Sequence, residues 1–204
     1  RWLVAPPAGE VCAIAAGASS SLPEGLDGWV VWSSNRYGNH DIVRMRLGGR
    51  HISRLTKPPQ TETCPRIAPN GSQSVFMRSR RPWVSLRDLI HWDTYLLDVK
   101  TGRERLLAEF AGAPTWSADG KSVFFQRRGV EFVEHDLSSG EERVRFRSGA
   151  GGLPEGVQLY EPSLSADLEQ LAVTWRGSRR MTAIVDAGGS VRATGGGGQS
   201  TWAP

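Results

Sequence analysis

The sequence has few of the residues that build metal centres, disulfide frameworks and membrane spans. Its 204 residues include two cysteines and four histidines. The cysteines, Cys12 and Cys64, form no Cys-x-x-Cys pair, so no zinc motif is present. The longest stretch without charge, residues 11–23, is far shorter than the roughly 20 apolar residues that a membrane helix needs. No transmembrane segment and no signal peptide are predicted, although a mature secreted chain would have lost its signal peptide.

Catalytic and cofactor motifs are also missing. The sequence contains no G-x-S-x-G elbow, no P-loop and no H-E-x-x-H. The pairs His40-Asp41 and His135-Asp136 join neighbours on predicted strands, and such neighbours point to opposite faces. The sequence therefore predicts no catalytic residue, no metal site and no cofactor, and the chain is expected not to be an enzyme.

The positive charge is almost entirely arginine. The chain has 22 arginines and three lysines, and its net charge is +4. A biased genome composition would produce the same excess. Binding to nucleic acid would call for a stronger basic excess with interleaved aromatic residues, so this function is disfavoured.

A short phrase recurs along the chain. Residues 65–71 read P-R-I-A-P-N-G, residues 114–120 read P-T-W-S-A-D-G, and residues 162–168 read P-S-L-S-A-D-L. The opening of the phrase returns at residues 201–204. The starts lie 49 and 48 residues apart, a period that indicates stacked supersecondary units.

Each phrase precedes a short apolar run that is typical of a strand, at residues 74–77, 122–125 and 171–175. A third strand follows at 94–99, 131–134 and 182–185, and a glycine turn then leads to a more polar fourth strand. Four antiparallel strands per unit, repeated without a helix, predict a β-propeller. A two-sheet sandwich is the alternative, but it gives no reason for one phrase to recur in every unit.

The predicted fold class is therefore all-β, with about four and a half four-stranded blades that belong to a larger, six-bladed propeller. The expected blades are residues 22–63, 64–112, 113–160 and 161–199. A half blade at 1–21 precedes them, and a new blade starts at 200–204. Cys12 and Cys64 fall on blades that are not neighbours in sequence, so a disulfide between them is disfavoured.

Arginines gather just after the second strand of successive blades, and such loops share one face of a propeller. They could bind carboxylates or phosphates, or form a solvated rim. The long insertion at residues 80–92 adds two tryptophans, a residue type enriched at interfaces. The loop could instead fold back and shield its own blade edge. The predicted partner-binding residues are Trp83, Arg87, Trp92, Arg80, Arg81, Arg127, Arg128, Arg179 and Arg180, on a face that also carries Arg36, Arg78 and Arg176.

The stretch from Val31 to Ile42, W-S-S-N-R-Y-G-N-H-D-I after its first residue, resembles the repeat of TolB-like propellers, and Arg54-Leu55-Thr56 matches the end of that repeat. The phrase at 114–120 is similar to the Pro-x-Trp-Ser-Pro-Asp-Gly that opens each repeat of this family. The resemblance is strong in the first two complete blades and weak in the last, where Leu168 replaces the turn glycine. The matched residues build the blade, so they carry over no binding residue.

The resemblance implies a periplasmic or secreted propeller that docks other proteins. We therefore expect a non-catalytic interaction scaffold or accessory subunit in a cell-envelope or membrane-anchored assembly, with no nucleic acid among its partners. The alternative is the gating propeller of a serine peptidase of the prolyl-oligopeptidase or tricorn type. A third possibility is a sugar or small ligand in the central channel.

Overall fold

A computed structural model describes residues 28–150, 154–165, 167, 169–176, 180–186 and 190–196. These residues form four successive antiparallel sheets and no helix. The strands are β1 (Trp29–Ser34), β2 (Asp41–Arg46) and β3 (Ile52–Arg54); β4 (Glu62–Ile67), β5 (Gln73–Ser79), β6 (Trp92–Asp98) and β7 (Glu104–Ala108); β8 (Ala111–Trp116), β9 (Ser122–Arg127), β10 (Glu131–Asp136) and β11 (Glu142–Arg147); β12 (Gln158–Leu164), β13 (Gln170–Arg176), β14 (Arg180–Asp186) and β15 (Val191–Gly196).

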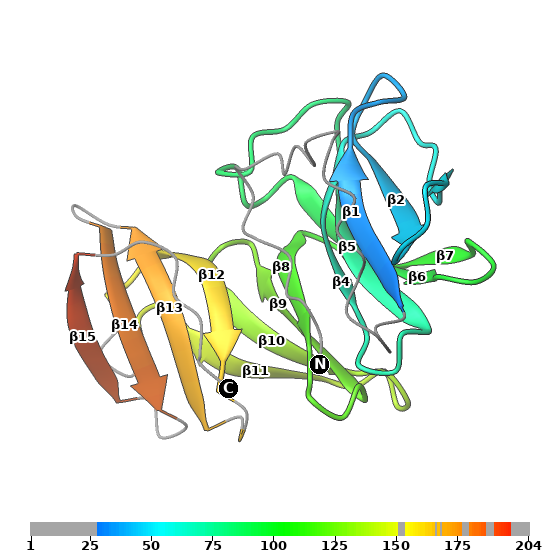
Figure 1. The fold of residues 1–204 in the computed structure, drawn as a ribbon. Helices are drawn as coiled ribbons and strands as arrows, with labels where there is room; N and C mark the ends of the chain where they lie inside the picture. The colour runs from blue at the N-terminus through cyan, green and yellow to red at the C-terminus, as the bar shows by residue number, and fades with distance from the viewer. Residues whose placement is uncertain are drawn as a thin grey trace.

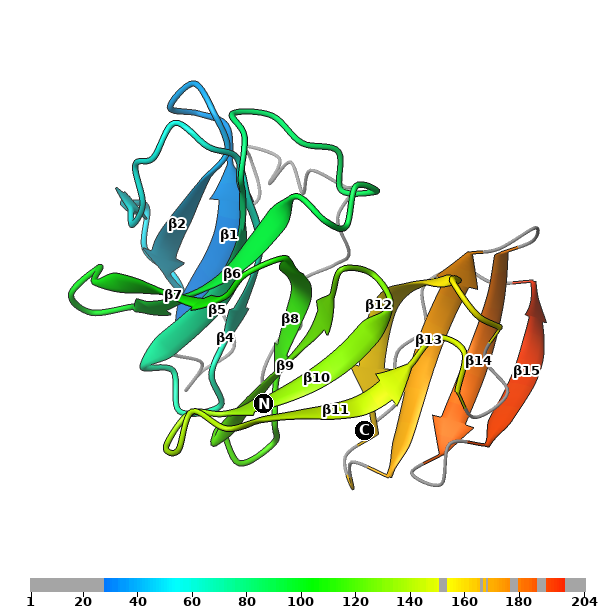
Figure 2. The same cartoon turned by 180° about the vertical axis from the view of Figure 1, so that it is seen from behind.

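The sheets follow one another as blades (Figures 1 and 2). The strands that lead each blade are in contact, β4 with β8 and β8 with β12, and β1 contacts β4. Each sheet pairs only strands that are consecutive in the sequence, which excludes the two-sheet sandwich. The prediction of an all-β, partial β-propeller with four-stranded antiparallel blades is confirmed.

Several predictions fall on residues outside the described ranges. They concern the half blade at 1–21, the start of the 22–63 blade, the end of the last blade and the new start at 200–204. Within the first blade, β1, β2 and β3 correspond to the predicted second, third and fourth strands. Cys12 also lies outside the described residues, so the prediction against a disulfide with Cys64 stays a prediction.

The core lies between the blades. Val31, Ile42, Phe76 and Leu97 fill the space between the first and second sheets. The neighbours Phe124 and Phe125 point to opposite sides of β9, where Phe125 packs toward the second sheet and Phe124 toward the fourth. The second strand of the blade is buried on both faces, so its residues do not alternate between apolar and polar. This burial explains the continuous apolar runs in the sequence.

The recurring phrase builds the turn between the first and second strands. In the third blade, Ser117 Oγ donates to Asp119 Oδ1 (2.7 Å), and the Ser122 backbone N–H donates to Ser117 Oγ (2.9 Å). Gly120 adopts φ +72°, which favours glycine. Ser165 and Asp167 repeat the first contact in the fourth blade. The serine and aspartate of the phrase are therefore turn-forming residues.

The first proline of the phrase lies in a β-bulge. The pairing of β4 with β5 shifts between Thr63 and Arg66, and that of β8 with β9 shifts between Gly112 and Thr115. Cys64 and Ala113, the residues just before the prolines, have positive φ angles of 52° and 49°. A bulged residue leaves the ladder, so proline is tolerated there although it has no N–H to donate.

Trp116 links two blades directly. Its Nε1–H donates to the Arg66 carbonyl on β4 (2.9 Å), and the ring packs against the cluster between the second and third sheets. The tryptophan of the phrase therefore fastens its blade to the preceding one.

We predict that Trp116→Phe lowers the free energy of unfolding by about 1 kcal/mol for the lost hydrogen bond, besides the cost of a smaller ring. Trp175→Phe is the control, because Trp175 packs in the next interface with no hydrogen bond to its indole among the described residues. Urea denaturation of both variants measures the difference. Equal losses would show that the Trp116 hydrogen bond contributes nothing.

Candidate docking surface

The loops after each second strand lie together on one face, which we call the loop face. The described ones are residues 35–40, 80–91 and 128–130, whereas 177–179 lies outside the described ranges. The connections between blades reach the same face, as backbone hydrogen bonds show. The N–H groups of Glu62, Arg128 and Leu159 donate to the carbonyls of His40 (2.8 Å), Phe110 (2.8 Å) and Gly129 (2.7 Å).

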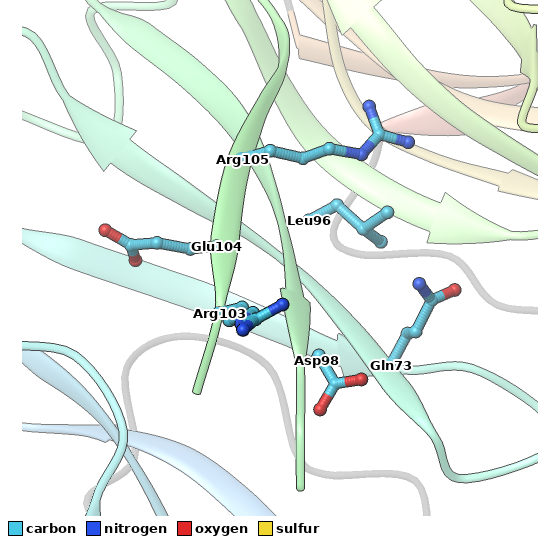
Figure 3. Close-up of a pocket in the computed structure, with 6 residues that line it drawn as sticks. All are labelled: Gln73, Leu96, Asp98, Arg103, Glu104 and Arg105. Carbon is cyan, nitrogen blue, oxygen red and sulfur yellow. The ribbon is translucent and has the colours of Figure 1, made fainter. Parts of the chain in front are cut away.

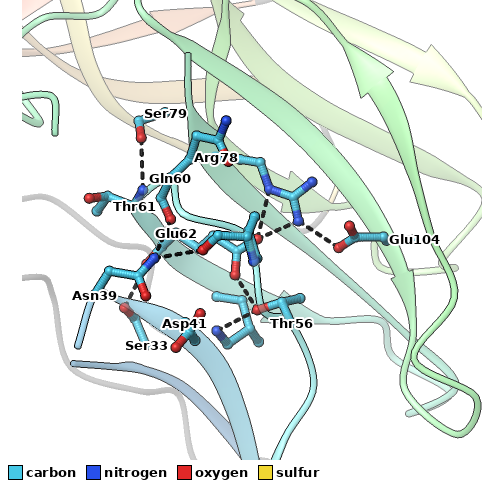
Figure 4. A network of polar contacts seen from close by, with 12 residues as sticks. Ser33, Asn39, Asp41, Thr56, Gln60, Thr61, Glu62, Arg78, Ser79 and Glu104 are labelled. Carbon is cyan, nitrogen blue, oxygen red and sulfur yellow. Dashed lines mark hydrogen bonds and ion pairs between the residues drawn. The ribbon is translucent and has the colours of Figure 1, made fainter. Parts of the chain in front are cut away.

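A buried hydrogen-bond network around Glu62 lies at the edge of this face (Figure 4). Glu62 at the start of β4 is fully buried, and its Oε1 accepts from Arg78 Nε (2.8 Å). Arg78 also donates to Glu104 Oε2 on β7 (2.6 Å). Thr56 Oγ1 donates to Glu62 Oε2 and accepts from the Ile42 N–H (2.9 Å). The Glu62 carboxylate thus joins Arg78 on β5 to Thr56, which follows β3 of the preceding blade.

Side-chain hydrogen bonds tie the first loop to this point. Ser33 Oγ donates to the Glu62 carbonyl (2.7 Å). Asn39 Nδ2 donates to the carbonyls of Pro58 (2.7 Å) and Gln60 (2.8 Å) in the following connection. The Asn of the matched repeat is therefore a loop-fixing residue.

The insertion at 80–91 is anchored to the body of the propeller. Val84 and Leu89 are buried, and Trp92, the first residue of β6, is 1% exposed. Val84 and Trp92 pack with Met77, and the indole Nε1–H donates to the Ser85 carbonyl (3.2 Å). The structure removes Trp92 from the predicted contact residues, because a buried indole cannot touch a partner.

Leu89 attaches the insertion to the third blade. A Cβ placed on Gly129 would lie 2.9 Å from Leu89 Cδ1, and Gly129 has φ +75°. Close approach and backbone conformation both require glycine here. The loop therefore spans two blades.

The outer side of the same loop is apolar. Trp83 is 77% exposed, Leu86 42% and Ile90 48%. The backbone beneath them is held in place: Thr61 Oγ1 donates to the Pro82 carbonyl (2.9 Å), and the Arg80 N–H donates to the His91 carbonyl (2.9 Å). These three side chains, which we call the apolar triad, are exposed on an anchored loop.

The predicted arginines divide into two groups. Arg80 pairs with Asp93 (2.7 Å) and Glu109 (3.3 Å), and Arg127 pairs with Glu142 (2.6 Å). Arg81, Arg87 and Arg128 are exposed and form no ion pair within the described part of the chain. Arg180 is exposed at the start of β14, and Arg179 lies outside the described residues.

Phe110 lies between two of these arginines. The guanidinium carbons of Arg80 and Arg128 are 4.1 and 5.0 Å from its ring centroid. Phe110 and Arg128 both adopt a positive φ of 51°, which is unusual for residues other than glycine. Cation–π contacts to one ring therefore hold two arginines on the loop face.

A separate open hollow of about 180 Å³ lies on the second blade, bounded by strands β5, β6 and β7 (Figure 3). Leu96 lies at its centre, and Glu104 points away from the other side chains (Figure 3). The hollow contains none of the predicted contact residues. Its lining residues are Gln73, Leu96, Asp98, Arg103, Glu104 and Arg105.

The described residues lack two further features. They contain no group of three or more His, Cys, Asp and Glu residues that could hold a metal ion. They also contain no helix long and apolar enough to cross a membrane.

Comparison with solved structures identifies the fold. A candidate TolB from Agrobacterium tumefaciens superposes with a TM-score of 0.60 at 17% sequence identity, over 81% of this chain and 60% of that one. The fold is that of a TolB-like β-propeller. The chain thus spans less than two thirds of that protein. No family model matches the sequence, and no curated protein sequence matches it.

Proteins with other functions share this TolB-like fold. An auxiliary nutrient binding protein from Bacteroides thetaiotaomicron gives a TM-score of 0.54 at 9% identity, over 83% of this chain and 43% of that one. A prolyl endopeptidase gives 0.51 at 16% identity, over 86% and 30%. At these identities the likeness establishes the fold alone.

Sequence reasoning missed Phe110, Leu86 and Ile90 as members of the surface. Leu86 and Ile90 were part of the insertion but carry no interface signal by type. Phe110 is a single aromatic residue in a two-residue connection, and only the fold places it beside Arg128. The only sign in the sequence was the position of Phe110 beside Glu109, in the short connection between two strands.

We predict that Gly129→Ala lowers the free energy of unfolding by about 1 kcal/mol or more, because the alanine Cβ meets Leu89 in a left-handed conformation. Gly140→Ala is the control, since φ there is +74° with nothing within 4 Å of the added Cβ. Thermal unfolding measures both variants. If the two substitutions cost the same, the Leu89 contact does not constrain the loop.

We also predict a pH dependence that comes from Glu62. Burial raises the pKa of Glu62 to about 7, against the opposing effects of the Thr56 hydrogen bond and the Arg78 charge. The stability that protonated Glu62 contributes is fully present below its ordinary pKa of 4.5 and is lost as the pH rises through about 7. Urea denaturation between pH 5 and 8 should show a fall across this window.

Glu62→Gln should remove most of this fall, because glutamine keeps the shape and does not ionise. Glu155→Gln, on the exposed connection into β12, is the matched control and should keep it. Parallel curves for wild type and Glu62→Gln would contradict the assignment.

Proposed function

We propose that this chain is a non-catalytic docking propeller that holds another protein against its loop face. One observation carries the proposal: the apolar triad of Trp83, Leu86 and Ile90 is exposed on a loop that is otherwise anchored. A solvated rim has no need for three large apolar side chains exposed on one loop, whereas interaction sites do. The triad contains a tryptophan, and the same loop carries the exposed Arg81 and Arg87. Both residue types are enriched among residues that dominate binding energy.

The assembly that we propose is located in the cell envelope, with this chain as a periplasmic or secreted accessory subunit. The likeness to the candidate TolB supports the propeller type, and the repeat resemblance supports the compartment. The chain would contribute four to five blades of a six-bladed propeller.

The gating propeller of a serine peptidase is the second candidate. It is favoured by the similarity to a prolyl endopeptidase, of which this chain covers 30%. Labelling of the native, full-length protein with a fluorophosphonate probe separates the two functions. A labelled serine outside residues 1–204 would establish the peptidase and overturn the docking subunit.

We predict that a photo-crosslinking amino acid at position 83 of the full-length protein captures a defined envelope protein in living cells. The same group at Val144, an exposed residue of the outer strand β11, is the control for nonspecific capture. Mass spectrometry identifies the products. Identical products at both positions, or none at position 83, would contradict docking on the loop face.

With the captured partner purified, Trp83→Ala should weaken binding at least tenfold, because the variant loses the most exposed member of the triad. Trp29→Ala is the matched control, since Trp29 is also exposed but begins β1 at the opposite end of the strand. Isothermal titration calorimetry measures both affinities. An unchanged affinity for Trp83→Ala would remove the triad from the interface.

A further inference from the structure

The charges on the loop face are not balanced within the described residues. Its exposed cations without an ion pair there are Arg36, Lys57, Arg81, Arg87 and Arg128. Its acidic residues are mostly engaged. Asp88 Oδ2 lies 2.8 Å from His91 Nδ1, and Glu109 pairs with Arg80. Glu155 is the one exposed carboxylate of the described loop face without such a contact.

Two arginines of the strands are paired with carboxylates in the same chain. Arg78 and Arg127 occupy equivalent positions, opposite Glu62 and Ala111 in the register of their blades. Both pair with a glutamate of the fourth strand, Glu104 and Glu142. Arg81, Arg87 and Arg128 lie outside this repeated position, and the described chain supplies no carboxylate for them.

From this imbalance, which rests on the proposed docking function, we infer the chemistry of the partner: the docked segment is an acidic polypeptide stretch with a large apolar side chain. Its apolar side chain packs on the triad, and its Asp and Glu carboxylates pair with Arg81, Arg87 and Arg128.

Arg128 is suited to a carboxylate by its geometry. Its guanidinium lies over the Phe110 ring, and a group stacked on an aromatic face keeps its N–H edges available for bidentate hydrogen bonds. The arrangement fixes the arginine before the partner arrives, which reduces the entropy that binding must remove. A planar carboxylate matches such a guanidinium edge.

An anionic membrane is the competing source of negative charge, and the loop argues against it. Arg87, Asp88 and Leu89 separate Leu86 from Ile90 in the sequence, and the Asp88 side chain is 44% exposed. A bilayer would have to accept that carboxylate beside its own negative headgroups. A polypeptide can place a neutral or basic residue opposite Asp88.

The test is a selection of random dodecapeptides, displayed on phage, against the full-length protein. Enriched sequences should combine Asp or Glu with Trp, Phe or Leu. The triple variant Arg81→Gln, Arg87→Gln, Arg128→Gln should lose this enrichment, and synthetic versions of the enriched peptides should bind it at least tenfold more weakly. Affinity for the wild type should also fall as NaCl rises from 50 to 300 mM.

The matched control is Arg103→Gln, Arg105→Gln, Arg143→Gln, which removes three exposed arginines: Arg105 on the outer strand β7, Arg103 just before that strand, and Arg143 on the outer strand β11. It should bind within twofold of wild type. Enriched peptides without carboxylates, or equal binding to both triple variants, would overturn the inference. A third outcome would favour a membrane and overturn the inference: no peptide is enriched, the wild type sediments with phosphatidylglycerol vesicles, and the loop triple variant does not.

The crosslink from position 83 separates this inference from the proposed function. A captured protein whose crosslinked segment lacks Asp and Glu overturns the acidic chemistry and leaves docking in place. Absence of both a captured protein and an enriched peptide overturns the two together.

Discussion

The blades of this propeller depend on one constraint, which is that the second and third sheets pack apolar side chains on both faces. On β9, Phe124 packs toward one neighbouring blade and Phe125 toward the other. Neither ring can be left in water without losing about 2 to 3 kcal/mol of burial, so each blade requires its neighbours. The loop face follows from this stacking, because inter-blade packing brings loops of different blades together. Leu89 of one blade therefore reaches Gly129 of the next.

Arginine has two uses in this chain, and the repeat separates them. The position occupied by Arg78 and Arg127 is opposite the first residue of the leading strand, and there arginine joins the second strand to a glutamate of the fourth. These groups belong to the blade. Arg81, Arg87 and Arg128 are in loops, where the repeat imposes no partner. The excess of arginine over lysine thus serves structure at one set of positions and leaves charge on the loop face at another.

Local signals explain why the fold could be predicted from the sequence and the surface only in part. The turn of Ser117, Asp119 and Gly120 is made within six residues, so its letters are visible in the sequence. Trp83 and Trp92 are alike by type, and what separates them is register: Trp92 pairs with Ser79 on β5 and is buried, whereas Trp83 precedes the anchors of the loop. The contact of Phe110 with Arg80 and Arg128 joins three separate segments, which no local pattern encodes.

Separation of anchors from exposed residues has a consequence for binding. Val84, Leu89 and Trp92 hold the insertion, while Trp83, Leu86 and Ile90 stay outside. The conformational entropy of the loop is therefore lost during folding, and no further loss is required when a partner binds. It follows that a substitution at an anchor acts on stability and binding together, whereas one in the triad acts on binding alone. In a loop that only shields a blade edge, a substitution at any position would change stability and binding together. This difference distinguishes a binding surface from a shielding loop.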